Sequence, residues 1–122
     1  MTNYLTILLF TSISILGCGN SVSIESKDAT HLVDNEKYYF LDVRTLVEHD
    51  NMSIPNTYCI PVQEISKRLS ELEEQKDKII VVYCRSGNRS SKATKILNDN
   101  GFNAVNLIGG MNKWDGETIT NN

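Results

Sequence analysis

Apolar runs alternate with amphipathic stretches along most of this chain. Runs rich in β-branched and aromatic residues, bounded by polar turns, predict β-strands. These runs lie at 22–24, 38–42, 58–60, 79–83 and 104–107. The stretches between them carry apolar residues at helical spacing and predict helices near 26–35, 45–51, 63–72 and 90–100. Strands that alternate with helices predict an α/β domain built on a parallel sheet.

The run at 79–83 reads IIVVY and has no polar alternation, which is typical of a strand covered on both faces. Cys84 follows it directly, and a helical stretch begins a few residues later, where Ser90 or Ser91 is suited to cap the helix. Cys84 is therefore expected at the carboxyl end of a strand. That edge of an open parallel sheet is where ligands bind, and the next helix directs its free N–H groups to the same place.

This setting has a direct consequence for a thiol. A cysteine at a helix amino terminus with cationic neighbours has a pKa of about 3.5–7.5, below the usual value near 8.5. A glycine within the loop lets successive N–H groups converge on one anionic atom. The residues expected to form this cradle around a nucleophilic Cys84 are Arg85, Ser86, Gly87, Asn88, Arg89 and Ser90, with both arginines able to hold an oxyanion. The alternative is a buried, inert cysteine that ends a core strand.

The segment at 84–90, CRSGNRS, resembles the active-site loop of single-domain rhodanese-like sulfurtransferases. Other segments similar to the family follow its order: Leu41-Asp42-Val43-Arg44 with Glu48, Ile54-Pro55, Ile60-Pro61, and Leu107 to Trp114, reading LIGGMNKW. The resemblance covers residues 22 to 114. It implies a three-layer α/β domain with a central, mostly parallel, five-stranded sheet and helices on both faces.

The resemblance also implies a mechanism. Cys84, as thiolate, takes the outer sulfur of a donor such as thiosulfate or a persulfide and passes it from a Cys84 persulfide to an acceptor thiol or cyanide. No metal or organic cofactor is implied. Asp42 and Arg44 are expected to support the adjacent loop as an ion pair. The family often has Gly-His before its first Ile-Pro, where this chain has Met52-Ser53, so His49 is expected only as a packing residue.

Two other functions stay open. Related phosphatases and arsenate reductases have five residues between the cysteine and the arginine of this loop, whereas four stand between Cys84 and Arg89. A shorter loop suits one sulfur atom better than a tetrahedral oxyanion. The second alternative is a tethered binding or sulfur-carrier module that has the fold and works through protein contacts.

The amino terminus has a different character. Residues 1–17 contain no charged side chain, and their apolar run is short for a membrane span. The run ends in Ile-Leu-Gly before Cys18, which resembles a bacterial lipoprotein signal, although no Lys or Arg precedes it. We expect residues 1–17 to be removed, Cys18 to be lipidated, 18–26 to form a tether and 22–118 to form the domain. The protein is then anchored in the cell envelope, facing the periplasm or exterior. An ordinary cleaved signal that yields a secreted protein, an uncleaved anchor and a core helix are the alternatives.

Composition, net charge and cysteine spacing exclude several classes of function. The chain has 122 residues, of which 40% are hydrophobic and 22% charged, as in ordinary globular domains of this size. Its net charge of −3 and scattered basic residues argue against binding of nucleic acid. None of the three cysteines has metal-ligand spacing, so no zinc site is expected. The family's sheet order separates Cys59 from Cys84, and we expect no disulfide between them.

Overall fold

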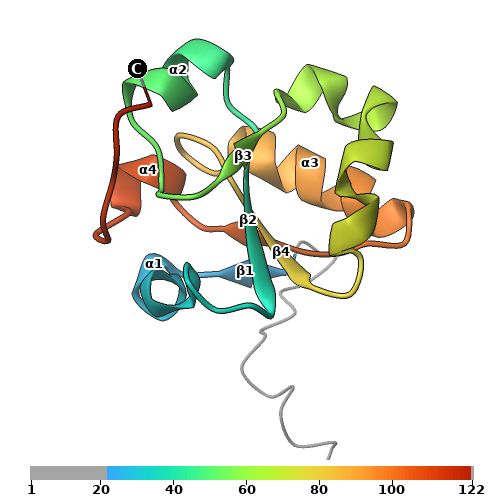
Figure 1. Cartoon of the computed structure of the whole chain (residues 1–122), viewed down its shortest axis with the longest axis horizontal. Helices are drawn as coiled ribbons and strands as arrows, with labels where there is room; N and C mark the ends of the chain where they lie inside the picture. The colour runs from blue at the N-terminus through green and yellow to red at the C-terminus, as the bar shows by residue number, and fades with distance from the viewer. Residues whose placement is uncertain (1–21, 122) are drawn as a thin grey trace, which may run out of the picture.

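A parallel sheet of five strands forms the centre of the molecule (Figure 1). The computed structural model describes residues 22–121. The strands are β1 (Ser23–Ile24), β2 (Tyr38–Asp42), β3 (Tyr58–Cys59), β4 (Ile79–Tyr83) and β5 (Asn103–Leu107). Their order is β1-β5-β4-β2-β3, with every neighbouring pair parallel. The predicted strands are confirmed, and β4 lies at the centre of the sheet.

Helices cover both faces of the sheet, as the three-layer fold requires. The helical elements are α1 (Ser26–Ala29), the 3₁₀ helices η3 (Thr30–Leu32), η4 (Val62–Lys67) and η5 (Leu69–Gln75), and the α-helices α2 (Leu46–Asn51), α3 (Asn88–Asp99) and α4 (Gly110–Lys113). One core cluster packs α3, η4 and η5 on the sheet, and the other packs α1 and Trp114 on the opposite face. Figure 1 shows these two layers around β4 and β2.

Residues of β4 alternate between the two cores because successive side chains of a strand point to opposite faces. Val81 and Tyr83 belong to the core under α1, whereas Ile80 and Val82 belong to the core under α3. Cys84 continues the second series. Its side chain therefore faces the layer that contains α3, whose first turn lies just beyond it in sequence.

Three helix predictions need correction. The helix expected near 26–35 is the short α-helix α1 followed by the 3₁₀ helix η3, which ends at Leu32. The helix expected over 63–72 is two 3₁₀ helices, separated at Arg68, where φ is −123° and ψ is 20°. The apolar stripe is compatible with either winding, and Ile65 and Leu72 are fully buried as expected. The start of α3 is also different, because Gly87 and not Ser90 or Ser91 occupies the N-cap. Gly87 has φ +112°, a conformation that glycine adopts without strain.

The short helix α4 was not anticipated, since the pair Gly109-Gly110 argues against a helix. Both glycines have positive φ, 76° and 50°, and turn the chain from β5 into α4. No helix between residues 22 and 121 is long and apolar enough to cross a membrane. The expected signal segment and Cys18 lie outside the described residues.

Candidate active site

Hydrogen-bond donors surround the Cys84 sulfur. The amide of Gly87 lies 3.1 Å from Sγ, and the amide of Ser90 lies 3.4 Å from it. The Ser90 hydroxyl lies 3.3 Å away and donates when the thiol is ionised. Cys84 is only 1% exposed, so water does not compete strongly for these donors. The loop at 84–90 therefore forms a pocket of donors around one sulfur.

Two opposing effects set the pKa of Cys84. Burial of the thiol disfavours the charged form and is the largest single effect. The Ser90 hydroxyl and the amides of Ser90, Gly87 and Ser86 favour the thiolate, and together they outweigh burial. The pKa of Cys84 consequently lies below that of an ordinary cysteine. The pattern is the one required of a cysteine nucleophile, because the thiolate and not the thiol attacks.

Helix α4 binds the backbone of the loop at 84–90. The amide of Met111 donates to the carbonyl of Cys84 at 2.9 Å, and the amide of Asn112 donates to the carbonyl of Arg85 at 3.0 Å. This close approach requires glycine at position 110, since a Cβ there would lie 2.2 Å from the Cys84 oxygen. The carbonyl and N–H of one trans peptide point in opposite directions. Fixing these two carbonyls on α4 therefore turns the following amides towards the other side of the loop.

Strand β5 supports the same loop through Asn106. Its side-chain amide donates to the carbonyl of Gly87 at 3.2 Å, and the amide of Ser91 donates to the same oxygen. Asn106 is 7% exposed, so this bond is made in the protein interior. The donors around Cys84 are thus set by contacts with β5 and α4 as well as by the loop sequence. Sequence reasoning missed both supports, because nothing in the residue pattern says which elements pack behind the loop.

The two arginines of the loop have different environments. Arg89 places its two terminal nitrogens 2.8 and 3.0 Å from the carboxylate of Glu48, which lies on α2. The hydrogen bonds from Arg89 are the main reason that the pKa of Glu48 falls to about 2. Arg85 is exposed, and no ion pair joins it to another residue within 22–121. Arg85 is therefore the loop cation available to a ligand, whereas Arg89 is already paired. Ser86 and Asn88 are exposed on the same loop.

The expected ion pair between Asp42 and Arg44 is present at the end of β2. Arg44 Nη2 lies 2.7 Å from Asp42 Oδ2, with the two side chains 6% and 0% exposed. Arg44 also donates to the carbonyl of Met52 at 2.6 Å, which ties β2 to the chain after α2. His49 has more than the packing role expected of it, since its Nδ1 lies 2.9 Å from Asp42 Oδ2.

Asp42, His49 and Cys59 each bring one potential metal-ligand atom within 4.8 Å of the others. The carboxylate of Asp42 already accepts hydrogen bonds from the amide, Nε and Nη2 of Arg44, in addition to its contact with His49. A divalent cation would have to displace these donors beside a guanidinium charge. The cluster therefore fits a structural network better than a metal site.

Cys59 is a second free thiol with a different character. Burial, followed by the charge of Asp42, raises its pKa to about 12. Its Sγ lies 3.5 Å from the carbonyl of Arg44. The strand that bears Cys59 is at the edge of the sheet, and β2 lies between it and β4. Of the two thiols, only Cys84 has the surroundings of a nucleophile.

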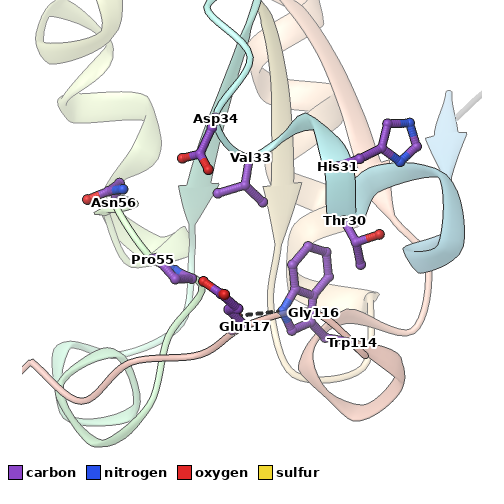
Figure 2. A pocket seen from close by; sticks show the side chains of 9 residues that line it. All are labelled: Thr30, His31, Val33, Asp34, Pro55, Asn56, Trp114, Gly116 and Glu117. Carbon is purple, nitrogen blue, oxygen red and sulfur yellow. Dashed lines mark hydrogen bonds between the residues drawn. The ribbon is translucent and has the colours of Figure 1, made fainter.

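A pocket of about 460 Å³ lies away from the Cys84 loop, beside Trp114 (Figure 2). It is lined by Thr30, His31, Val33, Asp34, Pro55, Asn56, Trp114, Gly116 and Glu117. The indole N–H of Trp114 donates to the carbonyl of Glu117 at 3.0 Å. The side chains of Asp34 and Glu117 carry negative charge into this pocket, which disfavours an anionic sulfur donor. The cradle around Cys84 remains the better candidate for the active site.

Comparison with known proteins agrees with this fold. The model of the rhodanese-like domain family matches residues 25–117. The Bacillus subtilis protein YtwF is 40% identical over 88 residues, covering 72% of this chain and 84% of its own. A sulfurtransferase of Allochromatium vinosum is 38% identical over 96 residues, covering 78% of this chain and 87% of its own. A rhodanese-like domain protein from Staphylococcus aureus has a crystal structure that superposes with a TM-score of 0.69, at 34% identity, over 78% of this chain and 92% of that one. The sheet order, the cysteine loop and these similarities together place this chain in the rhodanese-like domain family.

Proposed function

We propose that the protein is a sulfurtransferase that carries a sulfane sulfur on Cys84. The observation that supports this most strongly is the set of amide and hydroxyl donors around the Cys84 sulfur. Such donors stabilise a thiolate and, after transfer, the negatively charged outer sulfur of a persulfide. The name of the Allochromatium vinosum relative, sulfurtransferase, supports the same reaction.

The reaction has two halves. In the first, the Cys84 thiolate attacks the outer sulfur of the donor, a new sulfur–sulfur bond forms, and the donor leaves with the electron pair of its own broken bond. Thiosulfate leaves as sulfite, and a persulfide leaves as a thiolate. In the second half, an acceptor thiolate or cyanide takes the outer sulfur and the Cys84 thiolate returns. The two halves predict ping-pong kinetics with a covalent intermediate.

Each part of the loop has a role in this proposal. The amides of Ser86 and Gly87, with the amide and hydroxyl of Ser90, hold the charge on sulfur. Arg85 faces solvent and is available to the anionic part of a donor. Asn88 and Arg89 begin α3 and direct its amino terminus at the same sulfur. Only four residues separate Cys84 from Arg89, which supports a ligand smaller than phosphate or arsenate.

Mass spectrometry of the intact protein tests the proposal. After treatment with thiosulfate or an organic persulfide, the protein should gain the mass of one sulfur, which cyanide should then remove. Cys84→Ser should gain nothing, whereas Cys59→Ala should behave like the unmodified chain. A wild-type protein that gains no sulfur from either donor would favour a binding module. Phosphatase activity greater than sulfur transfer would favour a phosphatase of the same fold.

We also propose that residues 1–17 are cleaved off, and that Cys18 is then lipidated and anchors the protein in the cell envelope. The support is the uncharged apolar run and the Ile-Leu-Gly-Cys sequence at its end. After expression in a bacterium, the protein should enter the detergent phase on phase separation, and Cys18→Ala should return it to the aqueous phase. A wild-type protein that stays in the aqueous phase would contradict lipidation.

A further inference from the structure

Glu48 connects α2 with the amino terminus of α3. Its Oε1 accepts hydrogen bonds from the amide of Thr45 at 3.2 Å and from Arg89 Nη1 at 2.8 Å. Its Oε2 accepts from Arg89 Nη2 at 3.0 Å. The amide of Glu48 in turn donates to the hydroxyl oxygen of Thr45 at 3.2 Å, which completes a capping box. One carboxylate thus caps α2 and binds the arginine of the active-site loop at both terminal nitrogens.

This pairing changes the electrostatics of the site. A guanidinium close to a thiolate lowers the pKa of the thiol and attracts anions. Arg89 directly precedes Ser90, whose amide lies 3.4 Å from the Cys84 sulfur. The negative charge of Cys84 is also among the smaller causes that raise the pKa of Arg89, after the larger effect of Glu48. The carboxylate of Glu48 offsets part of the positive charge that Arg89 would otherwise present there. In its place, the thiolate is stabilised chiefly by neutral hydrogen-bond donors.

We propose that Glu48 is a positioning residue that sets donor preference by keeping Arg89 paired, so that the site favours persulfide donors over the dianion thiosulfate. This inference rests on the proposed sulfur transfer. The neutral donors match the single charge on a persulfide sulfur, whereas thiosulfate brings a doubly charged group that needs cations. With Arg89 paired, Arg85 is the one loop arginine left for that group.

Sulfur transfer from a persulfide donor to Cys84 needs no further reactant. The Cys84 thiolate attacks the outer sulfur of R–S–SH and forms a Cys84–S–SH persulfide. The bond between the two donor sulfurs breaks, and R–S⁻ leaves with the electron pair. The negative charge that Cys84 carries before the attack leaves on R–S⁻, so no further charge collects at the site and the Glu48–Arg89 pair need not open.

Glu48→Gln tests the proposal with little risk to the fold, because glutamine also serves in a capping box. The variant removes the negative charge and leaves the positive charge of Arg89 uncompensated. The expected result is a rise of about threefold to tenfold in kcat/KM for thiosulfate at low salt, carried mainly by KM. For glutathione persulfide, kcat/KM should stay within about twofold of the wild-type value. Thr45→Ala is the matched control. It disrupts the same cap and removes the hydroxyl that donates to Glu48 Oε1 at 3.1 Å, but it keeps the charges of Glu48 and Arg89.

A second readout does not depend on sulfur transfer. The pH dependence of Cys84 alkylation by iodoacetamide should move to lower pH in Glu48→Gln and stay unchanged in Thr45→Ala. Equal changes for both donors, or an alkylation profile that does not move, would overturn the inference. If neither donor loads sulfur on the wild-type protein, the proposed function fails, whereas the alkylation profile still decides the role of Glu48.

Discussion

Gly110→Ala perturbs the support of the site while it leaves the side chains of the Cys84 loop unmutated. A Cβ at this position would lie 2.2 Å from the carbonyl oxygen of Cys84 and 2.8 Å from that of Arg85. Both atoms are backbone, so α4 must move away from the loop. The move breaks the hydrogen bonds from Met111 and Asn112, worth about 1 kcal/mol each. The positive φ of 50° adds about 1–2 kcal/mol for a residue with a side chain.

The expected loss in the free energy of unfolding is therefore about 3–4 kcal/mol. Chemical denaturation measures this loss, and the pH dependence of Cys84 alkylation should show a raised thiol pKa because the loop amides are no longer held in place. Gly101→Ala is the matched control. It has φ +86°, and an added Cβ meets only Lys76 Nζ at 3.9 Å, so it should cost about 1–2 kcal/mol and leave Cys84 unchanged. Equal effects of the two alanines would refute the reasoning.

Three further predictions concern groups around the site. Ser90→Ala removes the hydroxyl donor, so the pKa of Cys84 should rise and alkylation at neutral pH should slow; an unchanged rate would contradict the role of that hydroxyl. Asp42→Asn leaves the guanidinium of Arg44 buried without its charged partner, and urea denaturation should show a loss of about 3–5 kcal/mol in the free energy of unfolding. The exposed control Asp99→Asn should lose about 0.5 kcal/mol or less, and equal losses would contradict the role of the buried pair. The pKa of Glu48 is lowered from 4.5 to about 2 in the folded protein, chiefly by its hydrogen bonds from Arg89. The ionised carboxylate therefore stabilises the fold fully above pH 4.5, and this contribution is lost as the pH falls through 2. Unfolding measured across that range should be less pH-dependent in Glu48→Gln, and parallel curves for the two proteins would exclude the contribution.

The main architecture could be predicted from the sequence because its signals are local. The unbroken apolar run of β4 indicates a strand buried on both faces. Cys84 directly after this strand, with Gly87 three residues later, indicates an anion-binding loop. The strands occupy the predicted positions to within one residue at either end. Periodicity could not distinguish two 3₁₀ helices from one α-helix over 63–72, because the apolar stripe satisfies both.

The support of the site depends on contacts between distant parts of the chain. Asn106 reaches the carbonyl of Gly87, 19 residues away in sequence, and Glu48 reaches Arg89, 41 residues away, and no local pattern encodes either contact. His49 and Asp42 are seven residues apart, but they lie on different elements. The capping box of Thr45 and Glu48 has a readable spacing, but the spacing does not reveal that the same carboxylate binds Arg89. Residue types therefore predict which thiol reacts, whereas tertiary contacts decide how its charge is held.

Titration of the Cys84 thiolate by its ultraviolet absorbance tests the central claim most directly. The difference between the wild-type protein and Cys84→Ser isolates this group, and Cys59, with its pKa raised to about 12, does not interfere near neutral pH. The donors around Sγ predict a midpoint clearly below about 8.5, the value of an unperturbed cysteine. A midpoint at or above that value would mean that burial outweighs the donors, and it would contradict a thiolate held ready for sulfur.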